Sequence, residues 1–309
     1  MSKNIFAVVD IGSNSLKVTV VDSHGIKELG RSTESVRLFP SGESPVRLHP
    51  DKLEQGAQAV ARLVKFAQDK GAQKIVLLGT SAVRECVNRD EFSAKIMELC
   101  GMPLTIISGE VEARLAAQGV RVDPVYANYR NILAFDLGGG SLEISKLHGK
   151  QCTFARSYPL GSVRLTSQLP ASPDGVIDEE HQLSFQIMIR SQLQDALLNE
   201  AARDSLLVGA GGAFTAIALY LEAMGEAPVS GRLPVLRIRE LKDRICNSTS
   251  DDRKQLKGIP ADRMDIMPAA LLTICVLADL TQAEAFYLTH YGVRQGMIQL
   301  LIAEDATHS

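Results

Sequence analysis

The sequence predicts an α/β protein made of two similar halves, and three observations carry that prediction. At roughly 150 residues per domain, a chain of 309 residues suits two domains better than one. A motif typical of a β-hairpin with a small-residue turn occurs twice, at residues 10–16 and 136–142. Around and between the two copies, strand-like and helix-like patterns alternate, as they do in layered α/β proteins.

The composition excludes several classes of protein. Hydrophobic residues make up 45% and charged residues 22% of the chain, which is ordinary for a globular protein and argues against disorder. A net charge of −3 provides no overall basic field, so no nucleic-acid partner is expected and any polyanion site must be local. The five cysteines form no CxxC pair and the six histidines show no ligand spacing, which argues against a zinc site or a disulfide framework.

Hydropathy argues against a membrane partner. No stretch reaches the roughly 20 clean apolar residues that a membrane span needs. The apolar run before Asp10 is too short for a secretory signal. The expected location is therefore the cytoplasm.

The first motif predicts a hairpin whose turn can bind an anion. An apolar strand ends at Asp10, and a strand with alternating character resumes at Leu16. Small residues in the turn let a ligand approach backbone N–H groups. The candidate phosphate-binding residues of this turn are Gly12, Ser13, Asn14 and Ser15.

The second motif repeats Asp, Gly, Ser and Leu at identical offsets, from Asp136 to Leu142, and ends on Glu143. Its candidate phosphate-binding residues are Gly138, Gly139, Gly140 and Ser141. One such hairpin is explained by the needs of a turn, whereas two matching copies favour a function. An acid at a buried strand end is costly unless it is paired or bound to a metal, so Asp10 and Asp136 suggest a shared cation.

A third glycine turn follows the apolar run at 206–208 and precedes a helical pattern from Ala213. A strand that leads into a helix N-terminus is a natural phosphate site, which makes Gly211 and Gly212 candidates. The turn is neither a Walker A loop nor a complete dinucleotide fingerprint, because Phe214 stands where the third glycine belongs. Taken alone, this turn is equally compatible with a structural role.

Strands and helices are also expected between the two hairpins. They are a helix at 51–70, a strand at 74–78, a helix that reaches Cys100, a strand at 103–107 and a helix at 109–119. Glu110 and Glu112 lie in the first turn of the last helix and point to different sides. Spacing alone makes both of them partners of the helix dipole. Arg84 is either a surface arginine or, because it follows a strand and a Thr-Ser turn, a phosphate clamp.

Seven blocks, in order, resemble the exopolyphosphatase and guanosine pentaphosphate phosphatase (Ppx/GppA) family, within the superfamily of actin, the sugar kinases and the Hsp70 ATPases. The blocks are residues 10–15, 80–88, 108–115, 136–143, 159–165, 260–268 and 291–296. The resemblance covers nearly the whole chain. It implies two ribonuclease-H-like domains of the actin-like ATPase type around an interdomain cleft, without the helical C-terminal domain of longer members.

The resemblance also implies a division of the chain. Domain I is expected at 1–125, with a C-terminal helix at about 294–309 packing back on it, and domain II at 126–309. The polar segment 121–131, which contains Pro124, supports this boundary. A homodimer is compatible with the resemblance.

The family chemistry is hydrolysis of a phosphoanhydride at a chain terminus. By motif, Glu112 is implied as the general base, Arg84 as a phosphate clamp, and Glu143 as a second essential carboxylate that orients water or Mg²⁺. Asp136 and Asp10 would be the other Mg²⁺ ligands. Lys17, Arg164, Arg263 and Arg294 are candidates to hold the rest of a polyphosphate chain. The sequence departs from the family pattern at Lys17, Val111, Leu142 and 209–213, but retains the base and the metal acids, so a working hydrolase is expected.

The leading hypothesis is therefore an exopolyphosphatase, a hydrolase of phosphoric anhydrides that uses Mg²⁺ and releases orthophosphate from inorganic polyphosphate. The nearest alternative is a 5′-phosphohydrolase of guanosine pentaphosphate (pppGpp), which shares the chemistry. A weakly catalytic sensor of polyphosphate or nucleotide is an alternative of another class. An actin-like ATPase or sugar kinase is disfavoured by the blocks around Arg84 and Glu112.

Overall fold

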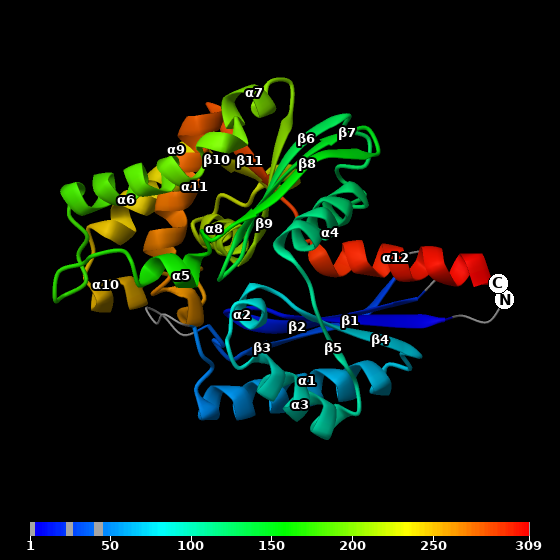
Figure 1. The fold of residues 1–309 in the computed structure, drawn as a ribbon. Helices are drawn as coiled ribbons and strands as arrows, with labels where there is room; N and C mark the ends of the chain where they lie inside the picture. Colours follow the sequence, from blue (N-terminus) through cyan, green and yellow to red (C-terminus); the bar gives the residue numbers. More distant parts are fainter. Residues whose placement is uncertain (1–3, 23–26, 40–45, 309) are drawn as a thin grey trace. The chain divides into compact units, whose positions relative to one another are not determined.

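The computed structural model describes residues 4–22, 27–39 and 46–308 (Figure 1). The chain divides into two compact units. Unit 1 comprises Met1–Val122 and Tyr291–Ser309, and unit 2 comprises Asp123–His290. Each unit is an α/β structure built on one mixed sheet. Among the helices of the described ranges, none has the length and apolarity needed to cross a membrane.

The sheet of unit 1 has the order β3-β2-β1-β4-β5. The strands are β1 (Ile5–Ile11), β2 (Ser15–Asp22), β3 (Glu28–Ser35), β4 (Lys74–Gly79) and β5 (Leu104–Ile106). The first three form an antiparallel meander, whereas β4 runs parallel to β1 and β5 parallel to β4. The central strand β1 is buried on both faces at 7–9, which explains its continuous apolar run.

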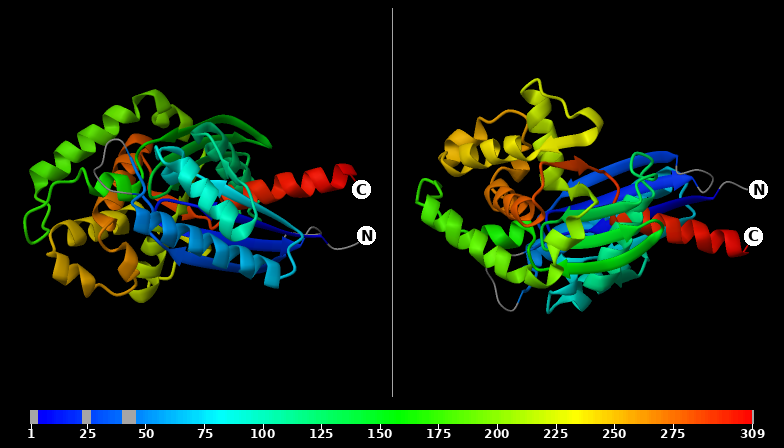
Figure 2. Two further views of the ribbon diagram at one scale, coloured as in Figure 1. Left: turned by 60° about the horizontal axis from the view of Figure 1, so that its bottom comes forward. Right: turned by 90° about the horizontal axis from the view of Figure 1, so that it is seen from above.

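Helices cover both faces of this sheet (Figure 1). They are α1 (Pro50–Asp69) and α3 (Arg89–Cys100) on one face, and α4 (Gly109–Arg121) and α12 (Val293–His308) on the other. Helix α12 lies along β1 (Figure 2), where Ile298 and Leu301 join the core around Phe6 and Val8. A Cβ at Gly119 would overlap the backbone of Gly292, so α4 and the start of α12 approach backbone to backbone.

The helix expected to reach Cys100 is present as α3, and a separate short helix precedes it. Helix α2 (Ser81–Arg84) stops after four residues, and α3 begins at Arg89. Between them, the amide of Asn88 accepts a bond from the Leu48 N–H and donates one to the Leu48 carbonyl, both at 3.0 Å. These two bonds tie Asn88, the N-cap residue of α3, to the backbone of Leu48. The helix at 51–70 and the strands at 74–78 and 103–107 are confirmed.

Unit 2 repeats the topology of unit 1. Its sheet has the order β10-β11-β9-β6-β7-β8. The strands are β6 (Asn131–Leu137), β7 (Leu142–His148), β8 (Gln151–Tyr158), β9 (Leu206–Gly211), β10 (Arg232–Pro234) and β11 (Ala285–Leu288). As in unit 1, three strands form an antiparallel meander, and the next two run parallel to its first strand. Strand β10 is an addition at the edge.

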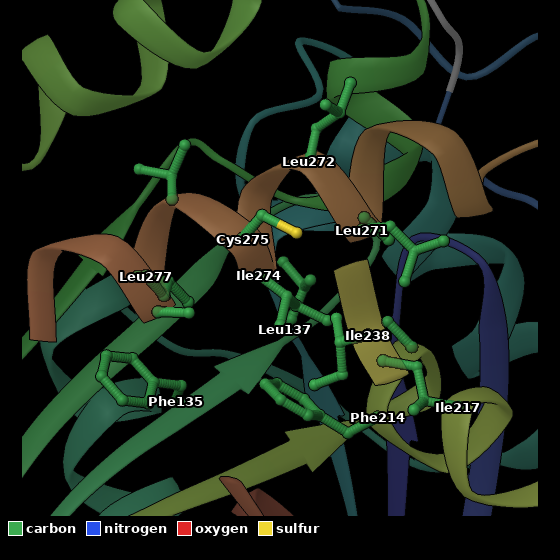
Figure 3. Close-up of a cluster of buried hydrophobic side chains, with 14 of the residues drawn as sticks. Phe135, Leu137, Phe214, Ile217, Ile238, Leu271, Leu272, Ile274, Cys275 and Leu277 are labelled. Carbon is green, nitrogen blue, oxygen red and sulfur yellow. The ribbon is translucent and has the colours of Figure 1, made fainter. Parts of the chain in front are cut away.

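The core of unit 2 gathers around one apolar helix. The helices are α5 (Ser162–Thr166), α6 (Glu179–Gln192), α7 (Leu198–Ala202), α8 (Gly212–Ala223), α9 (Val235–Cys246), α10 (Ser250–Lys254) and α11 (Met267–Thr281), with short 3₁₀ turns at 194–196, 229–231 and 261–263. Helix α11 is buried almost throughout, as expected for a helix that is apolar all round. Figure 3 shows its side chains beside Phe135, Leu137 and Phe214. The Phe214 ring occupies the space that a Cβ at Gly209 would need, so packing explains both residues.

Candidate active site

The hairpin of unit 1 places charges beside a buried turn. Asp10 on β1 lies directly opposite Lys17 on β2. Burial raises the pKa of the Asp10 carboxyl, and the positive charges of Arg294 and Lys17 oppose that rise. In the turn, Asn14 is 7% exposed, and within the described part of the chain neither polar atom of its amide has a hydrogen-bond partner. Leaving a buried polar group unpaired costs about 1–3 kcal/mol, and a bound ligand would offset that cost.

Arg84 and Glu112 meet at the carboxyl edge of the same sheet. The Arg84 guanidinium donates to the Glu112 carboxylate at 2.7 Å and to the Ile107 carbonyl at 3.0 Å. Glu112 is 6% exposed. Two residues earlier on α4, Glu110 is exposed and pairs with Arg114 at 3.0 Å. Both glutamates lie in the first turn of α4, as expected of dipole partners, but Glu112 in addition has a tertiary contact with Arg84 and is buried.

The hairpin of unit 2 places two acids side by side. Asp136 on β6 lies directly opposite Glu143 on β7, and residues paired in this way project from the same face. Glu143 is 4% exposed. On its other side the hydroxyl of Ser157, on β8, donates to Glu143 Oε1 at 2.7 Å. A row of cross-strand neighbours thus runs from Asp136 through Glu143 to Ser157.

The turn of this hairpin is held by the start of α5. The Ser162 N–H bonds the Gly138 carbonyl at 2.9 Å, and the Val163 N–H bonds the Gly139 carbonyl at 2.8 Å. Arg164 Nε donates to the Gly140 carbonyl at 2.8 Å. Because a trans peptide directs its N–H opposite to its C=O, the N–H groups that follow these carbonyls point away from α5. They belong to Gly139, Gly140 and Ser141, the backbone groups of the anion cradle that the sequence predicts at this turn.

The third glycine turn joins the same region of unit 2. Gly211 has φ 95° and caps α8, and the Asp136 Oδ1 atom lies 3.1 Å from where its Cβ would stand. A Cβ at Gly212 would overlap the guanidinium of Arg263. A carboxylate and a guanidinium therefore lie against adjacent glycines at a helix N-terminus, where the dipole favours anions.

Comparison with known proteins decides the family. A model of the Ppx/GppA phosphatase family matches residues 2–303. The chain belongs to this family. An exopolyphosphatase from Cytophaga hutchinsonii has the same fold, with a TM-score of 0.86 at 19% identity over 97% of this chain and 98% of that one. The Ppx-GppA enzyme of Aquifex aeolicus gives a TM-score of 0.78 at 22% identity over 98% of this chain and 100% of that one.

The Ppx/GppA resemblance and the two-domain actin-like α/β fold are thereby confirmed. In this phosphatase, unit 1 brings Arg84 together with Glu112, and Asp10 together with Lys17. Unit 2 brings Asp136 together with Glu143 and with the third turn. The roles of these residues in catalysis, phosphate binding and metal binding stay predictions.

One of the expected cationic residues of this Ppx/GppA protein, Arg164, bonds the turn itself. Its Nε–H donates to the turn carbonyl of Gly140, so Arg164 supports the cradle. Sequence reasoning missed Ser157, although it lies two residues before one of the matching blocks. The alternation of a strand at 151–158, paired with the strand after the second turn, could have placed Ser157 beside Glu143.

The residues present fit Mg²⁺. Within the described ranges no group of three or more His, Cys, Asp or Glu side chains is gathered to hold a metal ion. Mg²⁺ does not need such a cage, because it commonly takes one or two carboxylates and completes its shell with water and substrate phosphate. Asp136 and Glu143, opposite each other on β6 and β7, are a donor set of that kind.

Proposed function

We propose that this Ppx/GppA phosphatase is an exopolyphosphatase that hydrolyses the terminal phosphoanhydride of inorganic polyphosphate and releases orthophosphate. The observation that carries the proposal is the pairing of a buried carboxylate, Glu112, with Arg84. Terminal phosphoryl transfer needs a base for the attacking water and positive charge on the phosphate oxygens. These two residues supply one of each.

The ion pair also suggests how the base becomes available. In the structure the Arg84 guanidinium donates a hydrogen bond to the Glu112 carboxylate at 2.7 Å. A terminal phosphate is a competing anion for the same guanidinium, since arginine binds phosphate and carboxylate by the same charge-assisted bonds. Arg84 would turn to the phosphate, and the Glu112 oxygen would then accept a proton from water.

Unit 2 has its own candidate groups for binding phosphate and Mg²⁺. The N–H groups of Gly139, Gly140 and Ser141 would bind phosphate oxygens without a cost of reorganisation, because α5 already holds their peptide planes. Asp136 and Glu143 would hold Mg²⁺. When bound, this ion neutralises charge on the phosphate oxygens.

Cationic side chains beside the candidate phosphate-binding turns of both units favour a linear polyanion as substrate. Lys17 and Arg294 act on Asp10, and Arg263 lies on Gly212. Because the net charge is −3, these positive charges are local features. Their placement at both sets of candidate residues supports polyphosphate, which carries charge at every unit.

The test is phosphate release by the purified chain with Mg²⁺ from short polyphosphate, long polyphosphate and pppGpp. Replacing Glu112 by Gln should lower kcat by about 10²–10⁴-fold while the protein remains folded. Glu110→Gln is the matched control, since Glu110 is exposed on the same helix turn, and it should leave kcat within about threefold.

Three results would contradict the proposal in different ways. Faster release from pppGpp than from any polyphosphate would move the substrate to a guanosine pentaphosphate. Full activity in Glu112→Gln would refute its role as base. No release from any of the three substrates would leave the sensor hypothesis in place of an enzyme.

A further inference from the structure

The side chain of Ser157 has a position that neither the matching blocks nor the proposed mechanism explains. Serine on a half-buried strand is ordinary, and its hydroxyl could have bonded a backbone carbonyl of β7, as Thr153 on the same strand bonds the Lys146 carbonyl. Instead, Ser157 donates to the side chain of a β7 residue, Glu143 Oε1, at 2.7 Å. It is bound to the carboxylate that we assign to Mg²⁺.

The neighbours of Glu143 make that bond consequential. On one side its register partner is the carboxylate of Asp136, and on the other it is Ser157. Like charges directly opposite each other in a sheet repel, so Asp136 alone would turn the Glu143 carboxylate away from it. The bond from the Ser157 hydroxyl to Oε1 ties the carboxylate on its β8 side and fixes the plane of the carboxylate, so that repulsion by Asp136 does not leave it free to rotate.

The same segment of chain also holds the cradle. Ser157 is the last residue but one of β8, and only four residues separate it from Ser162, whose N–H binds the Gly138 carbonyl. A Cβ at Gly161 would overlap the backbone of Gly139, Gly140 and Ser141, which shows how closely this segment packs on the turn. Ser157 is therefore set on backbone that is fixed relative to the cradle, as an orienting residue must be.

We propose that Ser157 is a positioning residue, whose hydroxyl orients the Glu143 carboxylate toward the Mg²⁺ position beside Asp136. The proposal rests on the proposed function for the role of that carboxylate. Residues that orient metal ligands in this way commonly contribute about 10–100-fold to metal affinity or activity.

The chain contains its own matched control. In unit 1, the row that corresponds to Asp136, Glu143 and Ser157 is Asp10, Lys17 and Thr33. Thr33 thus occupies the register position of Ser157, but its neighbour across the sheet is a lysine. It also shows that threonine, a good strand former, occurs naturally at this position of the repeat.

The experiment compares Ser157→Ala, Ser157→Thr and Thr33→Ala in the full-length chain. The quantities measured are the Mg²⁺ dissociation constant by calorimetry without substrate, the Mg²⁺ half-saturation of phosphate release, kcat, KM and the unfolding temperature. Ser157→Ala should weaken Mg²⁺ binding and lower kcat, each by about 10–100-fold, at an unchanged unfolding temperature. Ser157→Thr should restore both quantities to within about threefold, and Thr33→Ala should change neither.

Outcomes that overturn the proposal are distinct from failure of the proposed function. Unchanged Mg²⁺ affinity and kcat in Ser157→Ala, with an active wild type, would overturn the role of Ser157 alone. Failure of Ser157→Thr to rescue would do the same, because the hydroxyl would then not be the group that matters. A wild type that binds Mg²⁺ but releases no phosphate would contradict the proposed function, while calorimetry would still test Ser157. A wild type that does neither would overturn both.

Discussion

The two hairpins share their backbone and differ in their charges. Asp10 and Asp136 occupy the same position of the repeat, and in both hairpins the residue seven positions later lies directly opposite. In unit 1 that residue is Lys17, and in unit 2 it is Glu143. The first pair is neutral as a whole, whereas the second carries two negative charges on one face of a sheet.

This difference suits the two copies of the repeat to different ions. In the first hairpin the lysine compensates the aspartate, and we propose that its turn binds an anion. Two acids side by side repel each other unless a cation joins them, so the second hairpin is suited to a metal ion that then attracts phosphate. The turn backbone is common to both hairpins. We therefore expect the residue opposite the aspartate, Lys17 or Glu143, to determine which ion each hairpin binds.

The largest effect is expected from making the second hairpin resemble the first. Glu143→Lys replaces a proposed Mg²⁺ ligand by a cation, and Mg²⁺-dependent phosphate release should fall by about 10³-fold. The reverse exchange, Lys17→Glu, keeps both acids of unit 2 and should raise KM for polyphosphate about tenfold through a lost charge-assisted contact. Steady-state kinetics measure both quantities. Equal losses of kcat in the two variants would show that the two hairpins do not differ in the way proposed.

A smaller effect, on stability, should distinguish the two glycines that end β4 and β9. Gly79 and Gly211 hold the same register, opposite Ile11 and Leu137. Only Gly211 has a positive φ, of 95°, and a Cβ there would overlap the Leu137 carbonyl. Gly211→Ala should therefore lower the free energy of unfolding by about 3 kcal/mol.

At Gly79 the nearest contact of a Cβ would be a Val83 side-chain atom at 3.3 Å. Gly79→Ala should accordingly cost no more than about 1 kcal/mol. Urea denaturation of both variants checks the difference. Similar losses at the two positions would show that the third turn is no more constrained than its counterpart in unit 1.

The smallest effect is expected at the glycine that the turns of the two hairpins share. Gly12 and Gly138 are equivalent, and a Cβ would lie 3.0 Å from the Ser15 carbonyl at the first and 3.2 Å from the Ser141 carbonyl at the second. Alanine at either position should destabilise the chain by a similar amount, about 1 kcal/mol. The same denaturation measurement applies, and a gap of more than about 2 kcal/mol between the two variants would show that the turns are not equivalent.

Much of the fold could be predicted because local patterns carry it. The repeated Asp-x-Gly-x-x-Ser-Leu motif predicted both hairpins, and apolar spacing predicted the helix that forms α1. The helix expected to reach Cys100 is present as α3, but its start at Arg89 was not predicted, and the bonds between Asn88 and Leu48 at that start join residues 40 positions apart. No window of local sequence contains both partners.

The candidate site shows the same division. By itself the sequence determined which residues stand at the ends of strands and in the turns, since hydrophobic period and small turn residues are local properties. Only the tertiary structure decided that Glu112 is buried against Arg84 while Glu110 faces solvent, that Arg164 supports a turn, and that Ser157 binds Glu143. The reason is physical, because each of these contacts joins different elements, and its geometry is set by strand register and helix packing that no single segment encodes.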